Sequence, residues 1–503
     1  MPSDYPHLPF VGMENVEAHS MRLLSTVPAA TMKSSGVHFK PGDVLYGRLR
    51  PYLNKVLKAV IEGLCSAEFI VFSDYGYINP SWLAYRLNSS DFVSFAAHLN
   101  EGDRPRVDHQ QISPFLIDLP PRPEQDRIVA EIEKQFTRLD DAVSALKRVQ
   151  ANLKRYRAAV LKTAYEGRLV PTEAELARKE CRVYEPASKL LKRILAERRA
   201  KWEADQLQKM IAARKQPKAN EWKIGYVEKM GPDASILPKL PTGWEWVSLG
   251  QLLREPLRNG HSAKESLTGD GVRTLTLTAI TTGDFSEPNI KMTNAARNKV
   301  RDLWLESGDI FVERSNTPEL VGISRLFTGP SSFAIFPDLL IRVRVSVLLD
   351  TKFVATVLLS DRTRNYFRRS AQGISGSMPK IDQTTIERTA IPLPPRDEQT
   401  RITEAVQRQI SQIDAAQKTV EIRLRTAQRL RQAILQTAFS GKLVPQFSHD
   451  EPACVLLERI RAERIGQGTN GKAPNVTNIA SPANNQRRRR VKKLAQRVSA
   501  GKA

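Results

Sequence analysis

The sequence is poor in cysteine and histidine. Its three cysteines, Cys65, Cys181 and Cys454, are spread over 503 residues, which excludes a disulfide framework and the paired spacing of a zinc finger. The seven histidines form no HExxH pair of the kind that binds zinc in metalloproteases. We therefore expect no metal site in this chain.

Long apolar runs are also missing. The most apolar stretches, such as 59–61 and 345–349, are far shorter than the about 20 residues that a membrane-spanning helix needs. The first residues of the chain lack the charged and apolar regions of a signal peptide. We expect a soluble protein that works in a reducing compartment.

Sequence motifs of common enzymes are absent as well. There is no GxxxxGK[ST] phosphate-binding loop, no GxGxxG after a strand-like run, and no Gly-x-Ser-x-Gly elbow. The segment Asn79-Pro80-Ser81-Trp82 is similar to the Asn-Pro-Pro-aromatic loop of amino-methyltransferases, but it lacks the second proline. No glycine-rich cofactor loop precedes it, and a helix N-cap followed by a proline in the first turn is the ordinary explanation. The sequence therefore predicts a protein that is not an enzyme.

Positive charge, by contrast, is in excess. The chain has 77 Lys and Arg against 54 Asp and Glu, a net charge of +23. Residues 487–503 hold eight of these basic residues and no acid, and the preceding stretch 466–486 is rich in Gly, Asn, Ser and Pro, as flexible linkers are. We predict a disordered basic tail over 466–503. The remaining charge suggests a polyanionic partner without identifying it.

The chain is an internal duplication. Residues 119–171 and 393–445 align without a gap, with 21 identities in 53 positions. A second match joins 185–198 to 451–464, with ten identities in fourteen. Weaker matches join 42–48 to 308–314 and 104–108 to 378–382. Each half of the chain is therefore a variable segment followed by a well-matched one.

The matched segments predict long helices. In the first, apolar residues recur in steps of three and four at Ile128, Ile132, Phe136, Leu139, Val143, Leu146, Val149, Leu153, Tyr156 and Val160, which is a heptad seam. The second runs through Ile402, Val406, Ile410, Ile413, Val420, Leu424, Ala427, Leu430 and Ile434. Gly167 and Gly441 stand where C-terminal caps belong. Equal length and similar seams favour an antiparallel coiled coil of the two copies over two helices that pack in separate domains.

The variable segments predict mixed α/β domains. Strand-like runs cover 43–46, 68–72, 273–277, 309–313 and 340–348, and helix-like runs cover 80–87 and 352–367. We place the boundaries as follows: a first globular domain over 1–118, a helical region over 119–171, a helix and linker over 172–240, a second globular domain over 241–392, a second helical region over 393–465, and the tail.

The duplicated motifs resemble those of a known family. The repeated LPPR-x-EQ-x-RI, the long helix and its end TA[YF]-x-G-[RK]-LVP look like the conserved regions of type I restriction–modification specificity subunits. Residues 240–250 (LPTGWEWVSLG) are similar to the opening of that family's target-recognition domains. The resemblance covers about residues 5–465.

The resemblance implies a fold and a function. Two mixed α/β target-recognition domains would flank an antiparallel coiled coil with pseudo-twofold symmetry. Each domain would read one half of a split site in double-stranded DNA, and the helices would set the gap between the halves. The implied partners are two methylase subunits and, optionally, two restriction subunits, in the cytoplasm of a prokaryote. S-adenosylmethionine, ATP and Mg would bind to those partners, and this chain would hold no cofactor.

Two other functions remain open from the residues alone. The chain could be a coiled-coil scaffold whose globular ends bind proteins, or an enzyme whose catalytic residues form no recognisable motif.

One departure from the family pattern concerns the first domain. The second domain has about 28 residues, from Trp244 to Val272, for which the first has almost no counterpart, because Val272 aligns near Pro6. We expect either that the assigned start lies too late or that the first recognition domain is incomplete.

Candidate contacts lie in the aligned loops. For DNA we predict Arg48, Arg50, Lys55, Arg104 and Arg106 in the first domain, and Arg314, Asn316, Arg342, Arg368 and Lys380 in the second. Arg suits bidentate contact with guanine and Asn suits adenine, whereas the alternative for each residue is a solvated charge or an ion pair. Glu124, Arg127, Glu398 and Arg401 are common to both halves. We predict that these four shape the helix starts or contact the methylase.

Overall fold

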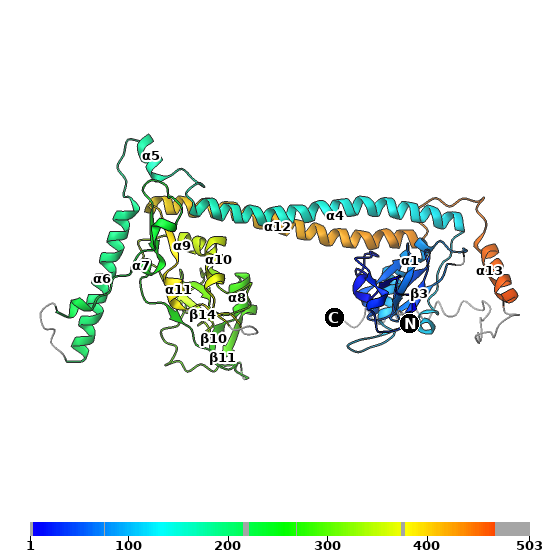
Figure 1. The fold of residues 1–503 in the computed structure, drawn as a ribbon, viewed down its shortest axis with the longest axis horizontal. Coiled ribbons are helices and arrows are strands. Elements are labelled where there is room, and N and C mark those ends of the chain that lie inside the picture. The colour runs from blue at the N-terminus through cyan, green and yellow to red at the C-terminus, as the bar shows by residue number, and fades with distance from the viewer. Residues whose placement is uncertain (1–3, 75, 215–220, 268, 374–377, 468–503) are drawn as a thin grey trace, which may run out of the picture. The chain divides into compact units, whose positions relative to one another are not determined.

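The computed structural model describes residues 4–74, 76–214, 221–267, 269–373 and 378–467 (Figure 1). The tail predicted over 466–503 lies, from residue 468 on, outside the described residues. The chain divides into two compact units: unit 1 is Met1–Ala142 with Thr426–Ala503, and unit 2 is Val143–Arg425. We call residues 4–118 of unit 1 domain 1 and residues 241–392 of unit 2 domain 2.

Domain 1 carries two small sheets with short helices. One sheet has the strand order β2-β1-β6-β3 and the other has the order β5-β4-β7. The strands are β1 (Pro9–Val11), β2 (Val27–Pro28), β3 (Gly36–Phe39), β4 (Val44–Gly47), β5 (Val56–Lys58), β6 (Gly63–Ser66) and β7 (Phe69–Phe72). The helices are α1 (Pro80–Leu87), α2 (Ser90–Ala97) and α3 (His109–Ile112).

Domain 2 repeats this plan with additional elements. Its largest sheet has the order β13-β12-β14-β9, and the pairs β10-β11 and β15-β8 stand beside it. The strands are β8 (Glu245–Ser248), β9 (Arg258–Asn259), β10 (Val272–Leu275), β11 (Ile290–Thr293), β12 (Ile310–Glu313), β13 (Ser324–Leu326), β14 (Leu340–Val343) and β15 (Ala390–Leu393). The helices are α7 (Leu249–Leu252), α8 (Leu277–Thr282), α9 (Thr351–Leu359), α10 (Asp361–Ser370) and α11 (Gln383–Glu387).

Two helices of 44 residues each carry the heptad seams: α4 (Arg122–Tyr165) and α12 (Arg396–Phe439). In unit 1, Ile128, Ile132 and Phe136 of α4 join Ile434 and Leu435 of α12 in one apolar cluster. The first turns of α4 thus meet the last turns of α12, as an antiparallel pair requires.

Ion pairs along α4 and α12 keep the same antiparallel register in both units. Asp140 pairs with Arg431 in unit 1. Arg157, seventeen residues further along α4, pairs in unit 2 with Asp414, seventeen residues earlier in α12. The predicted antiparallel coiled coil is confirmed. Not every seam residue is buried, however: Val149 is 44% exposed and Tyr156 is 52% exposed, because a two-helix pair covers only one side of each helix.

Both long helices end on the predicted glycines. Gly167 and Gly441 adopt φ values of 67° and 69°, the left-handed conformation that glycine adopts at little cost. The residues after them close the cap, with Arg168 N donating to Thr163 O at 2.9 Å and Lys442 N donating to Thr437 O at 3.1 Å.

Shorter helices follow each long one: α5 (Glu173–Lys179) and α6 (Ala187–Ala212) in unit 2, and α13 (Ala453–Gln467) in unit 1. The segment predicted as a linker is partly packed, because Trp222 stacks on Trp202 of α6 with ring centroids 6.1 Å apart. None of the helices in the described part of the chain combines the length and the apolar character that crossing a membrane requires.

Candidate nucleic-acid interface

Each domain brings two of the predicted loops together in the same way. In domain 1, Val107 N donates to Arg48 O at 3.0 Å, and in domain 2, Ile381 N donates to Arg314 O at 3.0 Å. The segment that follows β4 or β12 therefore lies beside the segment that precedes α3 or α11. Residues 104–108 and 378–382 occupy matching places, as their alignment predicted.

The predicted residues of domain 1 differ in their availability. Arg104 is exposed. Arg48 and Arg50 are half-buried, and the Nε atom of each is buried without a hydrogen-bond partner. Arg106 is exposed but forms an ion pair with Glu68 at 3.0 Å, and Lys55 donates from Nζ to Met13 O at 2.5 Å. Arg104, Arg48 and Arg50 thus have the most donor capacity left for DNA.

In domain 2 three predicted residues gather at the corresponding edge. Arg314 and Asn316 are half-buried, and Lys380 is exposed and bridges to Ser315 through the backbone. The Asn316 amide donates from Nδ2 to Glu313 Oε1 at 2.7 Å. Burial raises the pKa of Glu313, because it destabilises the ionised form of the carboxyl group. The Asn316 amide therefore contacts a carboxyl group whose negative charge is disfavoured.

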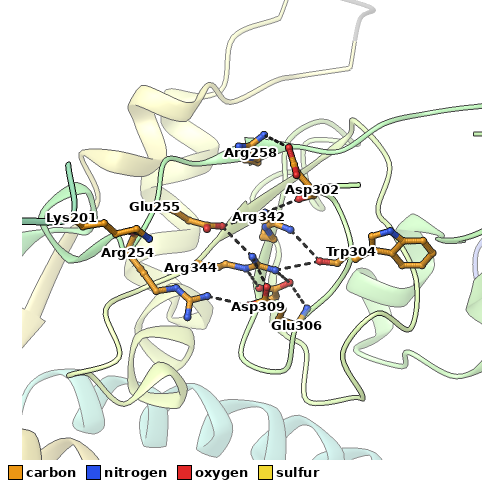
Figure 2. Close-up of polar contacts among 10 residues, drawn as sticks. All are labelled: Lys201, Arg254, Glu255, Arg258, Asp302, Trp304, Glu306, Asp309, Arg342 and Arg344. Carbon is orange, nitrogen blue, oxygen red and sulfur yellow. Dashed lines mark hydrogen bonds and ion pairs between the residues drawn. The ribbon is translucent and has the colours of Figure 1, made fainter. Parts of the chain in front are cut away.

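Arg342 does not lie at this surface. It is 3% exposed, and it donates to Glu255 Oε1 at 3.2 Å and to the Trp304 backbone oxygen at 3.3 Å. Figure 2 shows it beside Arg344, which reaches Asp309. Arg342 lies in β14 and Arg344 directly follows the strand, and their spacing of two residues in extended chain puts both on one face, where carboxylates contact them. Arg342 is therefore an interior ion-pair residue, and its predicted DNA contact does not agree with this placement.

A basic hollow of about 1090 Å³ lies within unit 2. Residues of α4, α8, β13, α9, α10 and α12 line it, and its cationic side chains are Lys154, Arg157, Arg325, Lys352, Arg364 and Arg368. Its acidic side chains are Asp361 and Asp414, and Asp414 is already paired with Arg157. The hollow is thus strongly positive, and Arg368 is the one predicted DNA contact among its lining residues.

Three arginines of this basic hollow, Arg325, Arg364 and Arg368, lack carboxylate partners among the described residues. Arg364 and Arg368 both donate to the Glu319 backbone oxygen, at 2.7 and 2.8 Å, and Arg325 donates to Ser324 O at 3.0 Å. Within the described residues none of these three forms an ion pair with a carboxylate. Burial, together with repulsion from Arg368 and Arg325, lowers the pKa of Arg364 to about 10. A bound anion would relieve this repulsion, and a phosphate group is such an anion.

Most of the cationic residues of this basic hollow were not predicted from the sequence. Arg364 and Arg368 stand four residues apart on α10, which places both on one face of the helix, and this spacing is a signal that could have found Arg364. Lys154 and Arg157 lie in α4, far along the chain from Arg325 in β13 and from α10. Only the tertiary fold brings them together.

The four residues common to both halves lie at the helix starts. Arg127 forms an ion pair with Asp450 at 2.6 Å, and Arg401 forms one with Glu173 at 2.6 Å. Glu124 accepts a hydrogen bond from Gln446 at 3.3 Å. These contacts tie each helix start to the segment that follows the other helix. A contact of these residues with a methylase stays a prediction.

Glu398 is the most enclosed of the four. It is 0% exposed, and it accepts from Trp244 Nε1 at 2.9 Å and from Glu173 N at 2.8 Å. Burial raises its pKa to about 7. In the described ranges, no group of three or more His, Cys, Asp or Glu side chains is placed to hold a metal ion.

Comparison with known proteins gives consistent relatives. The chain is 24% identical over 417 residues to the type I restriction enzyme EcoKI specificity subunit of Escherichia coli K12, which covers 81% of this chain and 75% of that protein. It is 30% identical over 244 residues to the StySPI specificity subunit of Salmonella potsdam, covering 45% of this chain and half of that protein. The chain matches no protein-family model.

A solved structure supports the fold. A chain from a study of complex assembly and conformational transition in the type I R-M system matches with a TM-score of 0.60 and 18% identity, over 88% of this chain and 94% of that one. The two α/β domains and the antiparallel helices are thus a known architecture. By its sequence and its fold, the chain is a homologue of the specificity subunits of type I restriction enzymes.

Proposed function

We propose that this chain is the DNA-sequence specificity subunit of a type I restriction–modification complex. The observation that carries the proposal is the duplication, in which two unlike domains are attached to matching helical segments. Unlike domains can read unlike half-sites, while matching helices give both domains the same support. Homology to specificity subunits favours this function over a scaffold that binds only proteins.

The chain itself would supply binding and no catalysis. Double-stranded DNA would contact the basic hollow and the paired loops, and base edges in the major groove would supply the sequence information. Two methylase subunits would carry S-adenosylmethionine, and up to two restriction subunits would carry ATP and Mg. We place this assembly in the cytoplasm of a prokaryote.

The function is tested by co-expressing the chain with the methylase subunit of its own genome and sequencing the methylated adenines. We expect one bipartite motif, two short blocks separated by a fixed unread gap. Replacing residues 241–392 with the corresponding domain of a homologue should change one block and leave the other intact. Loss of both blocks, despite a folded complex, would contradict modular reading.

DNA binding should also depend steeply on salt, because several phosphate contacts release counterions. We would titrate the DNA at salt concentrations from about 50 to about 200 mM. A DNA affinity that stays constant over this range would favour the protein-binding scaffold.

We further predict that α4 and α12 determine the gap. Deleting residues 143–149 together with 422–428 removes one heptad from each helix while keeping the register of the Asp140–Arg431 and Arg157–Asp414 pairs. Methylation of the native motif should fall to background, because the gap no longer fits. The control deletes no residues but replaces Val149 and Gln428 with alanine. A deletion variant that still methylates the native motif would show that the helices do not measure the gap.

A further inference from the structure

The two domains present different polar groups at one matching position. Leu49 and Ser315 form corresponding antiparallel bridges, to the segments that precede α3 and α11. The residue that follows the bridge is Arg50 in domain 1 and Asn316 in domain 2. An arginine side chain offers hydrogen-bond donors alone, whereas an amide offers both donors and an acceptor. The two domains therefore differ in hydrogen-bonding chemistry at a place where their backbone pairing agrees.

The Asn316 amide is held by two hydrogen bonds. Its Nδ2 donates to Glu313 Oε1 at 2.7 Å, and its Oδ1 accepts from Thr317 N at 2.8 Å. An amide has two N–H donors and two acceptor lone pairs, so one donor and one acceptor remain for a ligand. In the major groove adenine offers the complementary pair, with N7 as an acceptor and the N6 amino group as a donor.

Glu313 keeps this amide in one orientation. It stands at the end of β12 with a side chain that is 0% exposed, and its Oε2 has no hydrogen-bond partner among the described residues. If the amide of Asn316 turned away, the other carboxyl oxygen would also be buried without a partner, which is costly. The nitrogen of the amide is therefore held toward Glu313, and the amide cannot exchange its nitrogen and oxygen positions freely.

The loop that carries this amide is fixed to α10. The backbone oxygen of Glu319 accepts from Arg364 and Arg368 of α10, at 2.7 and 2.8 Å. Gly322 has a φ of 77° and lies so close to α10 that a Cβ on it would be 2.6 Å from the Phe367 Cβ. The amide and two arginines of the basic hollow thus belong to one packed unit, which lowers the cost of ordering them on a ligand.

We propose that Asn316 reads an A·T base pair in the half-site of domain 2 and that Glu313 is its positioning residue. The inference rests on the proposed function. Asn316 donates from Nδ2 to adenine N7 and accepts at Oδ1 from the N6 amino group, while its second N–H stays on Glu313. Arg50 has no acceptor, so domain 1 does not make this contact at its equivalent position.

The test uses the full chain in complex with the methylase of its own genome. Labelled duplexes carry the motif found by methylation sequencing, with each base pair of the block that belongs to domain 2 replaced in turn. For the native chain, replacing the A·T pair by G·C should weaken binding about 5- to 150-fold, the range of a bidentate base contact. In Asn316→Ala this preference should disappear at one A·T pair and persist at the other pairs of the block.

Two substitutions of Glu313 separate positioning from folding. Glu313→Gln keeps an acceptor for the Asn316 amide and should retain the A·T preference. Glu313→Leu has a similar size but no acceptor, and it should reduce the preference at the same pair at least about fivefold. Its affinity for DNA without the motif should not change. Asn298→Ala, at an exposed asparagine of the same domain, is the matched control and should leave every preference intact.

The outcomes that overturn the proposal are distinct from failure of the proposed function. An Asn316→Ala variant that keeps every preference, or loses preference equally at all pairs, would contradict base reading by this amide. A Glu313→Leu variant that discriminates like the native chain, or weakens binding to every duplex equally, would contradict positioning by Glu313. If the proposed function is wrong, the native complex methylates no bipartite motif, and the inference fails with it before any variant is compared.

Discussion

Replacing Arg344 with methionine is expected to destabilise domain 2 by about 3–5 kcal/mol, the cost of leaving a buried charge without its partner. Asp309 is 1% exposed and Arg344 is 8% exposed. Their side chains meet through two hydrogen bonds, one of them 3.1 Å long from Nη2 to Oδ2 (Figure 2). Asp309 also accepts from the Glu306 backbone N–H at 2.8 Å, so it cannot turn away without opening the turn before β12.

Denaturant-dependent hydrogen exchange in β12 and β14 measures this loss for domain 2 alone. Adding Asp309→Asn to Arg344→Met should recover more than half of it, because the amide keeps an acceptor for Glu306 and removes the charge. The matched control is Arg106→Met, which breaks an ion pair whose arginine is 48% exposed and should cost far less, because solvent screens an exposed pair; its loss is measured in the same way in β4 and β7 of domain 1. Equal losses in the two single variants would refute a special role for burial.

Replacing Arg364 and Arg368 together with glutamine should weaken DNA binding roughly 50- to 100-fold at 0.1 M salt. Each phosphate contact makes the fall of log affinity with log salt steeper by about 0.9. One contact therefore raises the affinity about tenfold at 0.1 M salt relative to 1 M salt. Both arginines line the basic hollow and lack carboxylate partners. The slope itself should fall by about 2.

The control removes the same charge from the same domain. Arg297 and Arg301 are exposed and do not line the basic hollow, so Arg297→Gln with Arg301→Gln should change affinity and slope much less. Fluorescence anisotropy with labelled duplex DNA, repeated over a range of salt concentrations, gives both quantities. Equal effects of the two double variants would mean that net charge, and not the hollow, governs binding.

Local patterns predicted the elements that local forces determine. The helix expected over 80–87 is α1 with the same bounds, because Asn79 accepts from Ser81 N at 2.8 Å and Pro80 begins the first turn. The helix expected over 352–367 instead divides into α9 and α10. Ser360 has a ψ of 149° and caps α10 by accepting from Thr363 N, a polar signal that the apolar periodicity around it concealed.

Tertiary pairing was harder to foresee. The strand expected over 340–348 ends at Val343, since the chain beyond it bridges to Leu253 through Val345. The sequence likewise shows Arg342 as one more basic residue, and its burial depends on Glu255, which lies 87 positions away. The two long helices were predicted correctly from their heptad seams, because a helix pair repeats one short-range contact many times.

Unit 1 is discontinuous in sequence, and this affects how the protein is made. Its core around Trp82, Ile128 and Ile132 is completed by Ile434, Leu435 and Ala438, whereas unit 2 is one uninterrupted stretch. At synthesis rates of about 5–20 residues per second, roughly 15–60 s separate residue 142 from residue 426. A nascent chain would therefore complete unit 2 first and leave the apolar stripe of the early helix uncovered for that interval, so the ribosome-bound chain is the state most exposed to aggregation.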